Sequence, residues 1–421
     1  MKFNVFKNTV LLFVLVMISC ASKAKDKTPF AFEGDQLIKQ AHDSKQIIVG
    51  ANQTESYLPL LKGKRIGIVA NQTSVIFKKS VSAQNASTNN HFVHLVDSLL
   101  ALHINVKKVF APEHGFRGNA DAGEAVKDGI DTKTNLPIVS LYGKNKKPSA
   151  EQLKELDIII FDIQDVGARF YTYISSLHYV MEACAEAGIQ LILFDRPNPN
   201  GHYIDGPVLE QTHKSFVGMH PIPVVHGMTI GEYAKMINGE KWLANGVQCD
   251  LMVISIKNYK HNLSYNLPIK PSPNLPNDKA INLYPSLCFF EGTNVSAGRG
   301  TETQFQIYGS PFLKKDVFHF EFTPQPNHGA KHPKYKSMLC YGENLMHDKP
   351  LNRLNLSWLI KAYNNTKNKD EFFNSFFTKL AGTKKLQQQI EAGLSEEEIK
   401  ASWQDNLNSF REIRKTYLMY N

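Results

Sequence analysis

Carboxylate side chains occupy short glycine-containing segments of the sequence, and three of them are candidates for acid–base chemistry. Glu113 begins the segment 113–118, and Asp162 and Asp165 lie in the segment 162–167. Hydrolysis of a glycosidic bond needs such groups: one carboxylic acid protonates the leaving oxygen, and the charge that develops at the sugar carbon is stabilised. These residues therefore predict a glycoside hydrolase site.

The three carboxylates are assigned different roles. Glu113 is our first candidate for the general acid, because the glycines of its loop leave the loop free to close over a sugar; the alternative is a structural carboxylate that caps a turn. Asp162 and Asp165 are candidates for the second carboxylate, although Asp165 could equally cap the following turn. If the substrate's own acetamido oxygen attacks instead, one Asp would orient that group. Glu124 is a further candidate.

Other side chains in these segments suit sugar recognition. The amides Asn71, Gln164 and Asn198 match hydroxyl or acetamido groups. Tyr171 and Tyr173 could stack on a sugar face, although their place at a helix start favours core packing for one of them. His114 could support the neighbouring acid, although a histidine in such a place is more often satisfied by backbone groups.

Signatures of several other chemistries are absent from the sequence. The segment 118–123 has the glycine spacing of a phosphate loop, but Glu124 follows it instead of lysine. No G-x-G-x-x-G follows the first predicted strand, and neither a nucleophile elbow nor H-E-x-x-H occurs. We therefore expect no cofactor and no metal. One alternative stays open, a metal-assisted phosphate or ester hydrolase. Its ligands would be Glu113, His114, Asp162 and Asp165.

The elements that position these residues alternate between short apolar runs and amphipathic stretches. Strands are predicted over 65–70, 106–111, 137–141, 158–161, 189–194 and 251–256. Helices are predicted over 92–102 and 172–187, after the capping box Ser149/Gln152, and after the capping box Thr229/Glu232. This pattern predicts an α/β fold with a Rossmann-like, doubly wound, mostly parallel sheet. Ligands bind outside the carboxyl ends of such strands, where the candidate residues stand.

The sequence changes in character after residue 268. Residues 280–345 are rich in Gly, Pro and aromatic residues, and helices are predicted over 354–363, 371–380 and from Ser395 onward. The last helix carries one apolar stripe, formed by Ile399, Trp403, Leu407, Phe410 and Ile413. We predict a Rossmann-like catalytic domain over 61–268, and a smaller α+β C-terminal domain over 269–421 that completes the cleft.

The N-terminus has the features of an export signal. Two lysines precede the apolar run 10–18, which is too short for a stable membrane span and ends before Ser19-Cys20-Ala21. We expect residues 1–19 to be a lipoprotein signal peptide, Cys20 to be lipidated, and residues 20–60 to form a tether and entry segment. The protein is then expected in the periplasm or at the outer membrane, held to a membrane only by its lipid. The alternative is a plain secretory signal that is cut nearby.

Composition limits the possible partners. The chain is 42% hydrophobic and 21% charged, which is ordinary for a globular protein. The formal net charge is +9, but the lysines are dispersed, so we expect no nucleic acid partner. Four further cysteines are scattered along the chain and are expected to be buried thiols: Cys184, Cys249, Cys288 and Cys340.

Several motifs in order make the sequence recognisable. They are Asn71-Gln72-Thr73, Pro112–Gly118, Phe161–Gly167 with Arg169–Tyr173, Asp195–Pro199, Pro271–Asn274, Glu291-Gly292-Thr293 and Gly298–Thr301. Together they resemble the NamZ-type exo-β-N-acetylmuramidases over nearly all of the chain from about Lys64. The resemblance implies a Rossmann-like catalytic domain, a smaller C-terminal domain and a cleft between them. It also implies release of N-acetylmuramic acid (MurNAc) from the non-reducing end of peptidoglycan fragments such as MurNAc-β-1,4-GlcNAc, in cell-wall turnover and recycling.

This substrate gives the arginines a role. MurNAc differs from N-acetylglucosamine (GlcNAc) by a lactyl carboxylate, which an arginine binds through two parallel hydrogen bonds. We expect one of four arginines to read it, although a salt bridge to a neighbouring Asp is an equal alternative for each: Arg117, Arg169, Arg196 and Arg299. A non-catalytic lipoprotein that only binds such fragments is the remaining alternative. Retention or inversion at the sugar carbon and the oligomeric state stay open.

Overall fold

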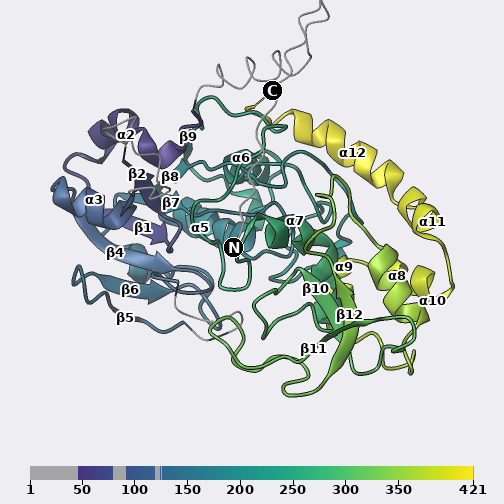
Figure 1. Ribbon diagram of the computed structural model, residues 1–421. Helices are drawn as coiled ribbons and strands as arrows, with labels where there is room; N and C mark the ends of the chain where they lie inside the picture. The colour runs from purple at the N-terminus through teal and green to yellow at the C-terminus, as the bar shows by residue number, and fades with distance from the viewer. Residues whose placement is uncertain (1–45, 79–91, 119–123, 125, 421) are drawn as a thin grey trace, which may run out of the picture. The chain divides into compact units, whose positions relative to one another are not determined.

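The computed structural model describes residues 46–78, 92–118, 124 and 126–420, and the largest sheet among these residues has seven strands (Figure 1). The strand order is β5-β6-β4-β1-β7-β8-β9. The strands are β1 (Ile66–Ala70), β4 (Val106–Ala111), β5 (Gly129–Ile130), β6 (Pro137–Ser140), β7 (Ile158–Asp162), β8 (Gln190–Phe194) and β9 (Leu251–Ile254). Neighbouring strands are parallel except at the β5–β6 edge. The predicted α/β fold with a mostly parallel sheet is confirmed.

Helices pack on both faces of this sheet, because its strands are apolar on both sides. Within β1, Ile68 packs with α2 (Thr54–Leu61) and α3 (Leu95–Ala101). The next residue, Val69, points to the opposite face, where α4 (Ala150–Leu153), α5 (Tyr173–Ala187) and α6 (Ile230–Gly239) contribute to the core.

Several local signals in the sequence set the observed helix ends. The capping boxes at Ser149, Thr229 and Ser395 all form, each with both reciprocal hydrogen bonds. Helix α5 ends at Gly188, which has a φ of 65° and so takes the left-handed position that glycine adopts without strain.

Three expectations about helices are wrong in detail. The helix predicted over 371–380 begins only at Phe376. The predicted helix from residue 92 begins only at Leu95, because residues Phe92–His94 form β3 and pair with β2 (Val75–Phe77). The predicted C-terminal helix is divided into α11 (Glu396–Ala401) and α12 (Gln404–Lys415) at Trp403, whose φ of −112° is not helical. The Ser402 hydroxyl bonds back to the Ile399 carbonyl at this point, a contact that favours a bend.

A second, antiparallel sheet lies in the C-terminal part of the sequence, with the order β10-β12-β11. Its strands are β10 (Ile307–Ser310), β11 (Phe320–Phe322) and β12 (Cys340–Asn344). The helices of this part are α7 (Asp278–Leu287), α8 (Ser357–Asn364), α9 (Phe376–Ala381) and α10 (Lys385–Glu391), besides α11 and α12. Short 3-10 turns are η1 (Gly50–Asn52), η2 (Gln211–His213), η3 (Ala244–Gly246) and η4 (Cys288–Gly292).

One hydrophobic core runs across residue 268. Leu177 of α5 belongs to the same buried cluster as Tyr284 of α7 and Phe377 of α9. Residues Ile47–Asn421 accordingly form one compact unit. Within it, Cys184, Cys249, Cys288 and Cys340 are buried free thiols, as predicted.

The N-terminal predictions fall largely outside the described residues. The predicted signal peptide 1–19, Cys20 and the tether up to residue 45 all lie outside the described residues. Among the described helices, none has the length and hydropathy that a membrane crossing requires. Inside the predicted entry segment, Tyr57 and Leu61 of α2 are fully buried, so this helix is part of the folded unit.

Candidate active site

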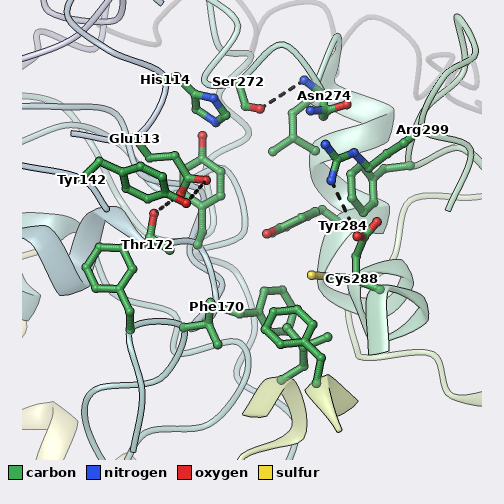
Figure 2. Close-up of a pocket in the computed structure, with 18 residues that line it drawn as sticks. Glu113, His114, Tyr142, Phe170, Thr172, Ser272, Asn274, Tyr284, Cys288 and Arg299 are labelled. Atoms are coloured by element: carbon green, nitrogen blue, oxygen red, sulfur yellow. Dashed lines mark hydrogen bonds and ion pairs between the residues drawn. The ribbon is translucent and has the colours of Figure 1, made fainter. Parts of the chain in front are cut away.

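Glu113 lies two residues beyond the carboxyl end of β4, at the edge where ligands bind in parallel sheets. The chain turns directly after it, because His114 and Gly115 both have left-handed φ values, of 70° and 77°. Two hydroxyls hold its carboxylate: Tyr142 donates to Oε1 at 2.9 Å, and Thr172 donates to Oε2 at 2.6 Å (Figure 2). Two other segments of the chain, those of Tyr142 and Thr172, thus orient the Glu113 carboxylate.

A cavity of about 270 Å³ opens beside Glu113. Its walls are mainly aromatic and apolar: Phe170, Tyr171, Phe216, Val217, Leu275, Tyr284, Phe305, Phe376 and Leu380. This volume lies just below the range of about 300–1,000 Å³ for drug-sized ligands, and suits a ligand with one sugar ring. Burial raises the pKa values of Tyr171 and Tyr284 well above their usual range, so both phenols stay neutral.

Two polar groups line the cavity on the side opposite Glu113 (Figure 2). The Arg299 guanidinium lies 3.6 Å from the Glu291 carboxylate. Asn274 is only 4% exposed, and neither atom of its side-chain amide has a hydrogen-bond partner among the described residues. A buried amide without partners is costly unless a ligand satisfies it, so Asn274 is a candidate binding residue, which the sequence marked only as part of a motif.

A half-buried lysine holds the turn that carries Glu291. The Lys334 ammonium donates to the backbone carbonyls of Phe290 and Thr293 at 2.9 and 2.8 Å, and to those of Glu291 and Val295 at 3.2 Å. Burial lowers the pKa of Lys334. The four carbonyls compensate for this desolvation and fix the polar side of the cavity.

Four predicted residues are therefore in contact with one cavity, and a fifth residue joins them. Glu113, His114, Tyr171 and Arg299 line it together with Glu291. The second carboxylate among its described lining residues is Glu291, which the sequence analysis noted only as part of a motif.

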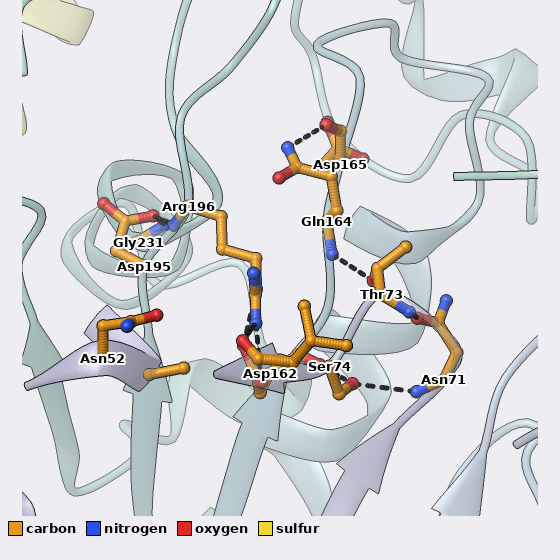
Figure 3. A network of polar contacts seen from close by, with 12 residues as sticks. Asn52, Asn71, Thr73, Ser74, Asp162, Gln164, Asp165, Asp195, Arg196 and Gly231 are labelled. Carbon is orange, nitrogen blue, oxygen red and sulfur yellow. Dashed lines mark hydrogen bonds and ion pairs between the residues drawn. The ribbon is translucent and has the colours of Figure 1, made fainter. Parts of the chain in front are cut away.

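Asp162 does not lie among the lining residues of this cavity. Its carboxylate is fully buried and forms a two-point ion pair with Arg196, at 2.7 Å to Nε and 2.9 Å to Nη2 (Figure 3). The Arg196 guanidinium also donates to the Val75 carbonyl. Asp162 and Arg196 thus pair with each other inside the protein. For Arg196, the alternative of a salt bridge to an Asp is the arrangement that the structure has.

Asp165 caps the turn that follows it, which was the alternative to a catalytic role. Its Oδ2 accepts the backbone N–H of Gly167 at 2.7 Å, and Gly167 has a left-handed φ of 75°. Burial raises the pKa of Asp165 to about 7. Like Asp162, it is absent from the lining of the cavity beside Glu113.

The predicted amides hold loops of the protein in place, and Figure 3 shows two of them, Asn71 and Gln164. Asn71 Oδ1 accepts from the backbone N–H and hydroxyl of Thr73. The Gln164 amide donates to the Asp165 and Pro197 carbonyls, and the Asn198 amide donates to the Met228 carbonyl. None of the three lines the cavity beside Glu113.

Arg169, Arg117 and Glu124 also form their hydrogen bonds or ion pairs with other residues of the protein. The fully buried Arg169 donates to four carbonyls, those of Pro207, Ile222, Leu380 and Ala381. Arg117 pairs with Asp97 and Asp131 at 3.2 and 2.7 Å. Glu124 pairs with Lys331. Among the four arginines, Arg299 alone lines the cavity.

The four residues that would be metal ligands in a metal-assisted hydrolase do not lie together in the structure. Asp162 is paired with Arg196 and Asp165 with the turn at Gly167, whereas Glu113 and His114 line the cavity. Within the described ranges, no three side chains of His, Cys, Asp or Glu are grouped so that they could hold a metal ion.

Together, the parallel sheet and the carboxylate-bearing cavity past its strand ends are typical of an α/β enzyme. Comparison with known proteins then identifies the family. The family model for the N-terminal part of the exo-β-N-acetylmuramidase NamZ matches residues 66–279, and that for its C-terminal part matches residues 282–420. The chain belongs to the NamZ exo-β-N-acetylmuramidase family.

Individual relatives agree with this assignment. The peptidoglycan β-N-acetylmuramidase NamZ of Bacillus subtilis is 40% identical over 390 residues, which cover 86% of this chain and 89% of that protein. A crystal structure of a DUF1343 family protein from Bacteroides fragilis is 47% identical, with a TM-score of 0.79 over 90% of this chain and 99% of that chain. A second one from the same species is 27% identical, with a TM-score of 0.73 over 89% and 99%.

Proposed function

We propose that this protein is an exo-acting glycosidase that releases MurNAc from the non-reducing end of peptidoglycan fragments. The observation that carries the proposal is the carboxylate of Glu113, held by two hydroxyls at a cavity that fits one sugar ring. The relative from Bacillus subtilis is named as a peptidoglycan β-N-acetylmuramidase. Peptidoglycan fragments are accordingly the substrate class.

Glu113 acts as the general acid in this reaction. It gives its proton to the glycosidic oxygen while the bond between that oxygen and the sugar carbon breaks, and the shorter glycan leaves. Water then supplies a hydroxyl to the sugar carbon and its remaining proton restores Glu113. The hydroxyls of Tyr142 and Thr172 keep the acid in position through both steps.

The opposite side of the cavity recognises the groups that distinguish MurNAc. The Arg299 guanidinium binds the lactyl carboxylate, and Glu291 orients that guanidinium at 3.6 Å. The Asn274 amide offers one donor and one acceptor, which match the carbonyl and N–H of the acetamido group. Both assignments follow from the chemistry of the substrate and the position of these residues in the lining.

A disaccharide tests the proposal. The purified protein is incubated with MurNAc-β-1,4-GlcNAc, and the products are separated by mass spectrometry. We expect free MurNAc and GlcNAc in equal amounts, with or without a chelator. An intact disaccharide after incubation with folded protein would contradict the proposal, and loss of cleavage in chelator would favour a metal-assisted hydrolase instead.

Export and lipidation are part of the same proposal. The sequence before Cys20 has the features of a lipoprotein signal, and peptidoglycan fragments lie outside the cytoplasm. We expect the cell to attach lipid at Cys20 and to hold the protein at a membrane of the envelope. Substituting Cys20→Ala should move the protein from the membrane fraction to the soluble fraction; unchanged fractionation would contradict lipidation.

A further inference from the structure

A second cavity, of about 350 Å³, lies next to the one that Glu113 lines. Ser272 lines both cavities. Asn274 lines the first cavity and Pro273 the second, so the segment 272–274 separates two adjoining spaces. A ligand longer than one sugar therefore has room on either side of this segment.

The dividing segment is fixed from both sides. On the side of the first cavity, the Tyr171 hydroxyl donates to the Pro271 carbonyl at 2.8 Å. On the side of the second, the Gln72 amide donates to the Pro271 carbonyl at 3.1 Å, and the Gln304 amide donates to the Pro273 carbonyl at 3.1 Å. These hydrogen bonds fix the position of the segment between the two cavities.

Gly329 lets another loop approach the same divider closely. A Cβ on Gly329 would lie 3.0 Å from Asn274 Oδ1 and 3.1 Å from the Pro273 carbonyl oxygen. Arg299 Nη2 donates to the Gly329 carbonyl at 3.3 Å. Since Gly329 lines the second cavity and Arg299 the first, the same contacts couple the two walls.

The two cavities differ in chemistry. The first has aromatic walls, whereas the second is lined by Gln72, Lys270, Glu302, Gln304, Asn327 and His328. The side-chain oxygens of Gln72 and Gln304 are buried, and neither accepts a hydrogen bond among the described residues. Free acceptors beside one lysine and one glutamate suit a neutral ligand that carries several hydroxyl and amide donors.

We propose that the second cavity binds the leaving-group sugar, a neutral N-acetylglucosamine residue, while the first holds the terminal MurNAc. This inference rests on the proposed function. The Gln72 and Gln304 amides accept hydrogen bonds from the hydroxyl and acetamido N–H groups of that sugar. The glycosidic bond then crosses the divider near Ser272, and the rest of the glycan extends from the second cavity.

Two substrates with the same terminal sugar test this inference. One is MurNAc-β-1,4-GlcNAc, and the other is an aryl β-MurNAc glycoside, whose leaving group is not a sugar. In the Gln304→Leu variant, we expect kcat/KM for the disaccharide to fall about 10-fold, the effect of one or two lost hydrogen bonds. The value for the aryl glycoside should fall less than that for the disaccharide, because only the lost hydrogen bond to the Pro273 carbonyl of the divider affects it; the ratio of the two values is therefore the readout.

Two further variants separate binding from folding. Glu302→Ala removes an exposed side chain that lines only the second cavity, and it should also affect the disaccharide selectively. Gln388→Leu changes an exposed glutamine outside both linings and serves as the matched control. Equal losses on both substrates, or no loss on either, would overturn the inference.

Failure of the proposed function would give a different result, since the wild-type protein would then cleave neither substrate. Calorimetric titration with N-acetylglucosamine decides the inference in that case. Binding to the wild type that is lost in Gln304→Leu supports a sugar site in the second cavity. Equal binding, or none to the wild type, overturns it.

Discussion

The Asp162 carboxylate and the Arg196 guanidinium face each other at 2.7 Å inside the protein, with 0% and 4% of the two residues exposed. Desolvation raises the pKa of Asp162, and the positive charge of Arg196 opposes that rise. Removing one member of a buried pair leaves the other charge without compensation. This ion pair indicates that Asp162 stabilises the fold, whereas the sequence alone made it a candidate for the second catalytic carboxylate.

Asp162→Ala should therefore lower the free energy of unfolding by about 3–5 kcal/mol, measured by urea denaturation. The exposed pair Arg65–Asp157, also 2.7 Å apart, gives a matched control. Asp157→Ala should lower the free energy of unfolding far less than Asp162→Ala, because solvent screens that pair. A stable Asp162→Ala protein without activity would contradict this assignment and restore Asp162 as a catalytic candidate.

Glu113→Gln should remove turnover without loss of stability. An amide of the same shape still accepts the Thr172 or Tyr142 hydroxyl, but it has no proton to give to the leaving oxygen. We expect kcat to fall about 100- to 10,000-fold on the disaccharide, with an unchanged melting temperature. Glu55→Gln, at an exposed glutamate on α2, is the control. Wild-type rates for Glu113→Gln would disprove its role as the acid.

Arg299→Gln should weaken the preference for MurNAc over GlcNAc. The variant keeps polarity but loses the charge that pairs with the lactyl carboxylate, and charged hydrogen bonds contribute about 1.5–3 kcal/mol. We expect kcat/KM for an aryl MurNAc glycoside to fall on the order of 10- to 100-fold, with little change for the GlcNAc analogue. The control is Arg117→Gln, because Arg117 pairs with Asp97 and Asp131 outside the cavity. Equal losses on both glycosides would exclude this role.

Asp165 makes stability depend on pH. Burial raises the pKa of this carboxyl from 3.8 to about 7, so the folded protein binds more protons than the unfolded chain between these values. The contribution of Asp165 to stability is full below pH 3.8 and is lost as pH rises toward 7. In Asp165→Asn this loss should disappear, so the variant should gain stability relative to the wild type as pH rises. Urea denaturation at pH 5 and pH 8 measures the change; a constant difference would contradict the raised pKa.

Local signals in the sequence determined the elements of the fold. The apolar runs gave β4 at Val106–Ala111, as predicted, and the pairing Ser149/Gln152 gave its capping box. Such features depend on neighbours a few residues apart, so a single sequence displays them. The position of Glu113 after β4 followed from the same reasoning, because a strand end fixes the edge of the sheet.

Only the tertiary structure decided which polar residues face the ligand. Asp162 and Glu113 both follow strands, yet one pairs with Arg196 from another loop and the other lines a cavity. Asn274 and Glu291 reach that cavity from segments that lie more than 150 residues after Glu113 in the sequence. No local pattern marks these two residues. The burial and the partners of a side chain are set by packing between distant segments, and that packing separates a binding residue from a structural one.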